Sequence, residues 1–275
     1  MRRFVLVLLC ATGSLGVVGM SRAQGLWWQH ERLQTGMYAV SADPSEVYIN
    51  SRGDVCYYAA ATAYDYFDAY RNRENLSEWL GPDRAARTRG INERGQVLYE
   101  AIHRAPWGGQ MLSLFVDQKN WTESLVGPGM SYDIHTWPQA GQRRLDDQGV
   151  PVFSFTAEYP GGRQVLYHGD RAISEEVLSG HTIIHAAGMN GAGTLVWSGE
   201  GAEFGGYAQT FVDTRPISFE VLGQGYGTSG RRINERGDVL WGGVNIDGYS
   251  DFFINEVNYS RSHFGNVGYN MLGQK

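Results

Sequence analysis

The sequence predicts an all-β protein, a small β-propeller of about five four-stranded blades. Three observations predict it: a short motif that occurs five times, a spacing of 42 to 54 residues between its copies, and a composition suited to short strands. The chain has 275 residues, with 37 Gly, 8 Pro and 13% aromatic residues, but only 19% charged residues. Many glycines and aromatics suit strands joined by tight turns, and the low charge argues against disorder.

Each copy of the motif begins with an apolar anchor and continues with Asn or Asp, two variable residues and Gly. The anchors are Ile49, Ile91, Leu145, Met189 and Ile233, spaced by 42, 54, 44 and 44 residues. We expect the anchor to end a strand, the Asn or Asp side chain to bond the backbone two residues on, and Gly to take a positive φ. These structural turn residues are Asn50, Gly53, Asn92, Gly95, Asp146, Gly149, Asn190, Gly193, Asn234 and Gly237. The spacing of 54 indicates an insertion of about ten residues within 103–142.

Mostly apolar residues follow each anchor at six and eight positions, which places both on one face of a second strand. The residues at eight are Tyr57, Tyr99, Phe153, Trp197 and Trp241, and those at six are Val55, Val97, Pro151, Leu195 and Val239. We expect this face to be buried in every repeat. Pro151 indicates a weakened or edge-like strand in the third repeat.

Two further strands fit in each period, which gives the four-stranded unit typical of a propeller blade. The third strand is expected at 66–67, 114–116, 166–167, 210–212 and 252–254, and the fourth ends at Leu80-Gly81, Val126-Gly127, Leu178-Ser179-Gly180, Leu222-Gly223 and Leu272-Gly273. Residues 37–48 supply a strand before Ile49, so the two ends of the chain can complete one blade. Residues 26–36 resemble an additional outer strand, which would belong to a sixth, partial blade. An open β-solenoid is the alternative architecture.

The best copies of the motif, Ile91 to Val97 and Ile233 to Val239, resemble the HAF repeats of bacterial extracellular proteins. The core of those repeats is an apolar residue, Asn, two variable residues, Gly, a variable residue and Val. The resemblance covers roughly residues 37–273 and is degenerate in the third and fourth copies. It implies a secreted, propeller-like fold and no enzyme activity.

Residues 1–23 are predicted to be a signal peptide. Arg2 and Arg3 precede an apolar stretch that ends at Met20, and Ser21-Arg22-Ala23 places small residues where a signal peptidase reads them. We expect cleavage after Ala23, an exported protein in the periplasm or the medium, and a single propeller domain over 24–275. A membrane anchor is the alternative, which the short length and three glycines of the stretch disfavour.

The mature chain is acidic and has one cysteine. Residues 1–23 carry three arginines and no acid, so their removal takes the net charge from −6 to −9. An acidic protein is a poor binder of nucleic acid, and no other stretch is long and apolar enough to span a membrane. Cys56 has apolar and aromatic neighbours, which favours a structural role over that of a nucleophile.

The sequence predicts no cofactor and no metal site, and it leaves catalytic residues unassigned. His181 and His185 would lie on one face of a strand about 13 Å apart, too far to share an ion. Asp117 and Asp213 take matching places after the third strand. Repetition favours a structural role, because a catalytic pair needs carboxyl groups in different environments.

Tryptophans outside the buried repeat positions are the candidate ligand-binding residues. They are Trp107, Trp121 and Trp137, and exposed aromatic rings stack on the faces of sugars. Packing between blades is the alternative role. The leading hypothesis is a non-catalytic scaffold that binds a glycan or a protein. A glycan-cleaving hydrolase or lyase with central carboxylates and a structural component of the cell envelope are the alternatives.

Overall fold

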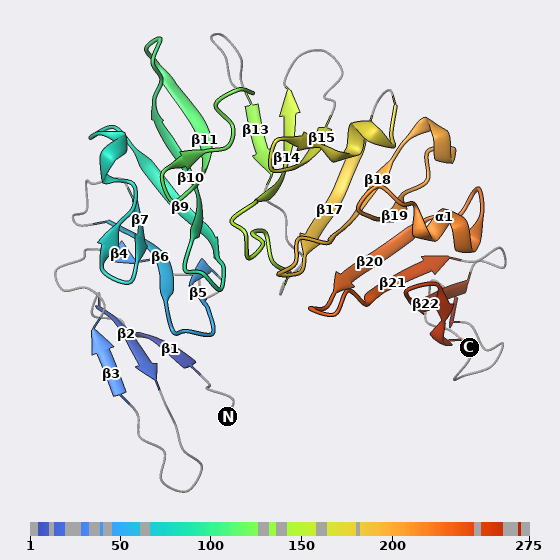
Figure 1. Ribbon diagram of the computed structural model, residues 1–275, viewed down its shortest axis with the longest axis horizontal. Coiled ribbons are helices and arrows are strands. Elements are labelled where there is room, and N and C mark those ends of the chain that lie inside the picture. Colours follow the sequence, from blue (N-terminus) through green and yellow to red (C-terminus); the bar gives the residue numbers. More distant parts are fainter. Residues whose placement is uncertain are drawn as a thin grey trace, which may run out of the picture. The chain divides into compact units, whose positions relative to one another are not determined.

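The computed structural model is mostly β (Figure 1). It describes residues 5–10, 14–19, 29–32, 39–40, 46–60, 67–125, 132–135, 142–157, 164–179, 182–244, 249–260 and 269–270. The chain divides into two compact units, Met1–Pro128 and Gly129–Lys275. The boundary between them falls inside the segment where the anchor spacing predicted an insertion.

Unit 1 has three antiparallel sheets among its described residues. An N-terminal sheet joins β1 (Val5–Cys10), β2 (Ser14–Gly19) and β3 (Gln29–Arg32). The first repeat sheet has the order β4-β6-β7-β8, with β5 also paired to β6; its strands are β4 (Ala39–Val40), β5 (Tyr48–Ile49), β6 (Val55–Ala60), β7 (Asp68–Arg71) and β8 (Glu74–Asn75). The second repeat sheet has the order β12-β11-β10-β9; its strands are β9 (Ala85–Ile91), β10 (Val97–Arg104), β11 (Gln110–Val116) and β12 (Lys119–Asn120).

Unit 2 also has three antiparallel sheets among its described residues. The third repeat sheet runs in the order β13 (Tyr132–His135), β14 (Val152–Ala157), β15 (Gln164–His168) and β16 (Arg171–Ala172). The fourth consists of β17 (Ile183–Met189), β18 (Leu195–Glu200) and β19 (Gln209–Val212). The fifth runs β20 (Thr228–Ile233), β21 (Val239–Val244), β22 (Tyr249–Ile254) and β23 (Val257–Asn258), with β24 (Tyr269–Asn270) also paired to β22.

Each sequence repeat therefore forms one antiparallel sheet of three to five strands. The strand predicted before Ile49 is present as β4 and β5, both paired with β6. The extra strand predicted within 26–36 is β3, which pairs with β2 from the predicted signal peptide. The ladders between described strands join strands of the same repeat, and one isolated bridge, between Arg143 and Met189, joins the third and fourth repeats. The described strands therefore do not include a blade completed by both ends of the chain.

The five predicted turns have the conformation that their sequence indicated. The motif glycines have φ between 83° and 89°. The Asn92 side chain accepts hydrogen bonds from the backbone N–H of Arg94 at 3.1 Å and of Gln96 at 2.9 Å. The Asp146 side chain accepts corresponding bonds from Gln148 and Val150, both at 2.8 Å. Because these bonds join residues two and four apart, the turn is determined locally.

A turn element recurs after the third strand of every repeat, where the sequence predicted a longer fourth strand. Four repeats have a fourth strand of only two residues, and the fourth repeat has none among its described residues. The chain coils near the aliphatic-Gly pair instead, at Glu78–Leu80, Ile173–Glu176 and α1 (Ile217–Leu222). Each coil places a hydroxyl against the third strand, as where Thr210 N–H donates to Ser218 Oγ at 2.8 Å. The same bond is made to Ser77, Thr122, Ser174 and Ser260, always eight residues from the donor. The pairs Val126-Gly127 and Leu272-Gly273 lie outside the described residues.

Two further strand predictions need correction. In the first repeat the third strand begins at Asp68, and Tyr70 rather than Phe67 is its core aromatic residue. Pro151 does not mark an edge strand, because β14 begins one residue later and pairs with β13 and β15. Proline at this place removes no hydrogen bond from the strand pairing within the sheet.

A stacked aromatic pair lies at the core of every repeat sheet. One ring comes from the position eight residues after the anchor and the other from the third strand. The pairs and their centroid distances are Tyr57–Tyr70 5.4 Å, Tyr99–Phe115 5.2 Å, Phe153–Tyr167 5.3 Å, Trp197–Phe211 4.1 Å and Trp241–Phe253 4.1 Å. The predicted buried face is confirmed, since each of the five anchor-derived aromatics is at most 1% exposed.

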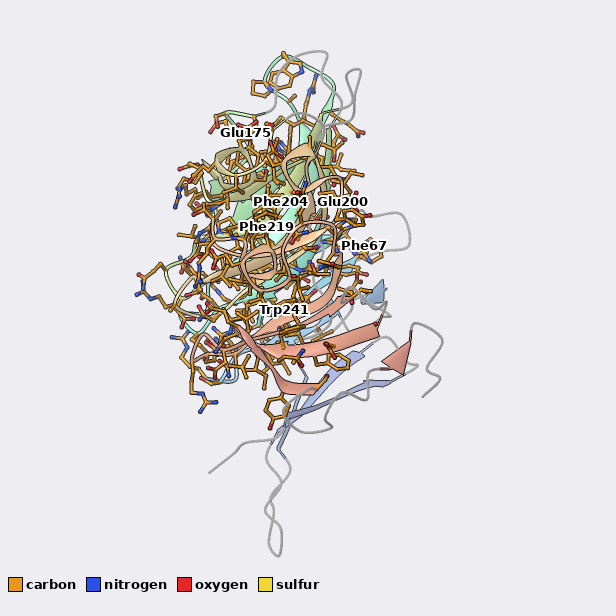
Figure 2. The ribbon with its side chains drawn as sticks, turned by 90° about the vertical axis from the view of Figure 1, so that its right-hand side faces the viewer. Phe67, Glu175, Glu200, Phe204, Phe219 and Trp241 are labelled. Carbon is orange, nitrogen blue, oxygen red and sulfur yellow. The ribbon has the colours of Figure 1, made fainter. Side chains whose placement is uncertain are left out.

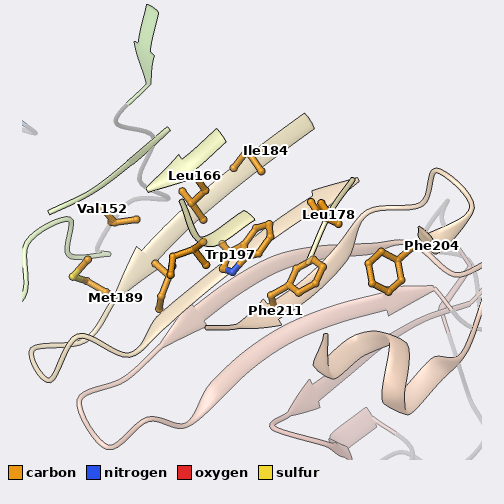
Figure 3. Close-up of a cluster of buried hydrophobic side chains, with 10 residues drawn as sticks. Val152, Leu166, Leu178, Ile184, Met189, Trp197, Phe204 and Phe211 are labelled. Atoms are coloured by element: carbon orange, nitrogen blue, oxygen red, sulfur yellow. The ribbon is translucent and has the colours of Figure 1, made fainter. Parts of the chain in front are cut away.

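The residue before each core aromatic packs on the next sheet within its unit. Val152 and Leu166 of the third sheet share a buried cluster with Trp197 and Phe211 of the fourth (Figure 3). Phe204 extends the same cluster, and its ring lies 5.1 Å from that of Phe219 (Figure 2). This sheet-to-sheet packing repeats in unit 1, where Cys56 and Ala69 of the first sheet share a cluster with aromatic residues of the second.

Candidate functional site

Only one of the three candidate tryptophans has a described, exposed ring. Trp107 is 45% exposed and lies between β10 and β11. Trp121 is 9% exposed, which corrects the expectation that it lies outside the buried positions. The ammonium of Lys119 lies 3.1 Å from the centroid of the Trp121 ring, so this cation covers one face of the ring. Trp137 lies outside the described residues.

The predicted turn residues join neighbouring repeats. Asn50 Nδ2 donates to the carbonyl of Asn92 at 3.0 Å, and a guanidinium nitrogen of Arg52 donates to the carbonyl of Arg94 at 2.8 Å. In unit 2, Gly191 N–H donates to the Glu235 carboxylate at 2.9 Å. These bonds join successive sheets of a unit and occupy polar groups of the turns.

Asp117 and Asp213 are also structural, and they belong to a second repeated turn. Both have a positive φ, 52° and 51°, after the third strand. Asp117 Oδ1 accepts from Val97 N–H at 3.1 Å, and Asp213 Oδ1 accepts from Leu195 N–H at 3.0 Å. Asn72 and Asn255 make the same bond in their repeats.

The described part of unit 1 contains a cleft of about 410 Å³. Its lining includes the rings of Tyr58 and Phe67, the charged side chains of Arg87, Arg89 and Glu100, and the aliphatic side chain of Ile102. The cleft lies around β9, which is the edge strand of the second repeat sheet. Tyr58 and Phe67 belong to the first repeat, so the cleft is built by two successive sheets.

The aromatic side of the cleft is partly open. Phe67, labelled in Figure 2, is 38% exposed. Its ring lies 5.1 Å from that of Tyr58 at an interplanar angle of 84°. The Arg87 guanidinium lies 5.6 Å from the centroid of the Tyr58 ring. An edge-to-face pair of this kind presents one ring face to a ligand while its neighbour holds it in place.

The charged side of the cleft is organised by Glu46, whose side chain is 10% exposed. Its carboxylate accepts hydrogen bonds from the Tyr58 hydroxyl and the Arg87 guanidinium, and it lies 3.7 Å from Arg89. Arg89 also pairs with Glu100 at 2.6 Å. Burial lowers the pKa of Arg87, but the hydrogen bond and the charge of Glu46 outweigh it, so the pKa is raised.

Two arginines therefore balance two carboxylates around the cleft. Such a wall offers directed donors and acceptors without a net charge, while the rings and Ile102 offer apolar surface. This combination can bind a neutral, amphipathic ligand. Arg89 Nε has no hydrogen-bond partner, which leaves one buried donor in this wall.

The sequence did not predict this cleft, because its residues belong to no single motif. Glu46 precedes the first motif and belongs to no repeated pattern. Arg87 and Arg89 alternate on a strand that was expected to lead into the second anchor, and this alternation was the available signal. The contact between Glu46 and Arg87 spans 41 residues, so only the stacking of the sheets brings them together.

The described part of the chain contains neither a cluster of metal-binding side chains nor a membrane-spanning helix. Among those residues no group of three or more His, Cys, Asp or Glu side chains could hold a metal ion. Over the same residues, no helix has the length and apolar character needed to cross a membrane.

No protein-family model matches the chain, and no curated protein matches it either.

Proposed function

We propose that this protein is an exported, non-catalytic binding protein whose ligand is a neutral glycan held in the unit 1 cleft. One observation carries the proposal: an exposed ring, Phe67, lies beside a charge-balanced wall formed by Arg87, Arg89 and their carboxylate partners. The apolar face of a sugar stacks on an aromatic ring, while its hydroxyls exchange hydrogen bonds with charged groups.

Calorimetric titration of the mature chain with a panel of neutral and acidic oligosaccharides tests this proposal. We expect Phe67→Ala to weaken binding of a neutral glycan roughly tenfold, since ring stacking contributes about 0.5–1.5 kcal/mol beyond area burial. Tyr207→Ala is the matched control, because Tyr207 is 48% exposed but lies in unit 2. Equal affinity in both variants, or no binding by the folded protein, would contradict the proposal.

Glycan cleavage is the second candidate, and the same cleft motivates it. Glu46 and Glu100 both contact Arg89, which places the two carboxylates within the roughly 5–10 Å that glycoside hydrolysis uses. Mass spectrometry of oligosaccharides released from polysaccharides tests this candidate. Products that disappear in Glu100→Gln would establish cleavage and replace the pure binding function.

We also propose that the repeat sheets close into a propeller of the kind the HAF resemblance implies. The packing of successive sheets within each unit supports closure, and the fifth sheet has an outer face with no neighbour among the described residues. On that face Leu240 is 44% exposed and Phe252 is 60% exposed, whereas the equivalent Val196 of the fourth sheet is fully buried.

Export with cleavage after Ala23 belongs to the same proposal, and it rests on the sequence of residues 1–23. Mass measurement of the protein recovered from the periplasm or the medium tests it. A mature N-terminus at Gln24 is expected, and an intact Met1 in exported protein would contradict it.

A further inference from the structure

We propose that Arg231 forms a buried binding site for one small oxyanion, a carboxylate or sulfate, between the fourth and fifth repeat sheets. Arg231 lies on β20 and is 6% exposed. None of the described acidic side chains forms an ion pair with it, and its Nε atom has no hydrogen-bond partner. An unpaired buried charge is costly, so a guanidinium in this setting favours a bound anion.

The polar surroundings of Arg231 follow from the packing of the two sheets. Ile233 and Val196 share one apolar cluster, and Arg231 and Ser198 each lie two residues from them on the same faces of β20 and β18. Thr210, the cross-strand neighbour of Ser198, donates through Oγ1 to Thr228 Oγ1 at 2.9 Å. The layer beside the apolar cluster is therefore lined with hydroxyl groups.

Ser198 provides an independent indication of a missing partner in this layer. Its side chain is fully buried, and its Oγ has no hydrogen-bond partner. A hydroxyl can donate to an anion, and a guanidinium donates to one in a fork. One oxyanion between Ser198 and Arg231 would satisfy both groups.

The equivalent sheet pair in unit 1 shows what such an arginine normally contacts. Arg89 lies two residues before its anchor, as Arg231 does, and pairs with Glu46 and Glu100. The residues at the corresponding repeat positions in unit 2 are Ala186 and Gly242, neither of which has a carboxylate. The sheet pair in unit 2 therefore has the arginine without a carboxylate at either of these two positions.

The charge state of Arg231 reflects the lack of a carboxylate partner among the described residues. Burial lowers the pKa of Arg231 to about 10. Arg231 still carries its charge at neutral pH.

Thermal unfolding of the mature chain in sodium acetate or sodium sulfate tests the proposal, with sodium chloride at equal ionic strength as reference. We expect acetate, sulfate or both to raise Tm by about 5 °C. Arg231→Gln should abolish the shift, while Arg232→Gln, which removes the exposed neighbouring arginine, should keep it. A response to acetate alone identifies a carboxylate ligand, and a response to sulfate alone identifies a tetrahedral one.

The variant Ala186→Glu provides a second test, which does not depend on the folding of Arg231→Gln. Ala186→Glu restores a carboxylate at the position of Glu46, so it should raise Tm in chloride and remove the response to acetate and sulfate. The proposal is overturned if neither anion stabilises the unaltered protein. It is equally overturned if the stabilisation persists at full size in Arg231→Gln or Ala186→Glu.

Discussion

At the scale of single residues, the motif glycines have a backbone conformation that other residues rarely adopt. Gly237 has φ of +89° and open space where a Cβ would be, so replacing it isolates backbone strain from steric contact. We expect Gly237→Ala to lower the free energy of unfolding by about 1–2 kcal/mol. Urea unfolding measures this, with Gly227→Ala as control, because Gly227 also has open space and no positive φ. Equal stability of the two variants would argue against strain in the turn.

The acidic residues that follow the motif glycines determine how the turns respond to pH. Hydrogen bonds from Asn50 hold the pKa of Asp54 below 3.8, and hydrogen bonds from Asn234 do the same for Asp238. A carboxyl with a lowered folded pKa stabilises the protein above its unfolded pKa, and this contribution is lost as pH falls through the folded value.

We therefore expect stability to fall as pH decreases below about 4, and less steeply in the double variant Asp54→Asn/Asp238→Asn. Urea midpoints measured between pH 2 and 6 test this. Identical pH profiles for the variant and the unaltered protein would show that these two turns do not contribute.

At the scale of elements, the turn between the third and fourth strands pairs with the start of the second strand in a regular way. Where the second strand begins with a residue that has an N–H, an Asn or Asp side chain accepts it, as Asn255 Oδ1 accepts from Val239 at 2.8 Å. In the third repeat that residue is Pro151, which has no N–H, and the turn residue is Gly169, which has no side-chain acceptor. The strand residue and the turn residue differ together, because a side-chain acceptor in the turn has no partner when the strand residue has no N–H.

This rule predicts opposite results in two repeats. Asn255→Gly keeps the positive φ but leaves the buried Val239 N–H unpaired, so it should cost about 1–3 kcal/mol. Gly169→Asn should bring no gain, since Pro151 cannot donate. Chemical denaturation of both variants checks the pair, and stabilisation by Gly169→Asn would refute the rule.

Cys56 shows how a sheet interface determines chemistry at this scale. The residue lies in the cluster between the first and second repeat sheets and is fully buried. Burial raises the pKa of its thiol. This agrees with the structural role predicted from its apolar neighbours, because a thiol that stays protonated is a poor nucleophile.

At the scale of the whole molecule, the outer face of the fifth sheet tests ring closure. If the sheets close, Phe252 becomes buried, and Phe252→Glu should cost about 3 kcal/mol because it places a charge in an apolar interface. Tyr207→Glu is the control, since Tyr207 is 48% exposed outside the sheet faces. Equal unfolding midpoints for both variants would show that Phe252 stays in solvent and that the ring is open.

The sequence by itself determined the features whose causes are local. The turn at Asn92 and Gly95 depends on hydrogen bonds between residues two to four apart and on one positive φ. The burial of Trp197 and Trp241 follows from the alternation of residues along a strand. Motif and period therefore predicted the five repeat sheets, their order along the chain and the core aromatic residues eight positions after each anchor.

Only the tertiary structure decided the features that depend on how sheets stack. It brought Glu46 to Arg87 and Arg89, buried Trp121 under Lys119, and left Arg231 without the carboxylates of its counterpart in unit 1. These contacts form between different strands and repeats, where the free energy depends on burial and partners rather than on spacing along the chain. A repeat pattern specifies which positions face inward, but the pairing of charges at those positions differs from one interface to the next.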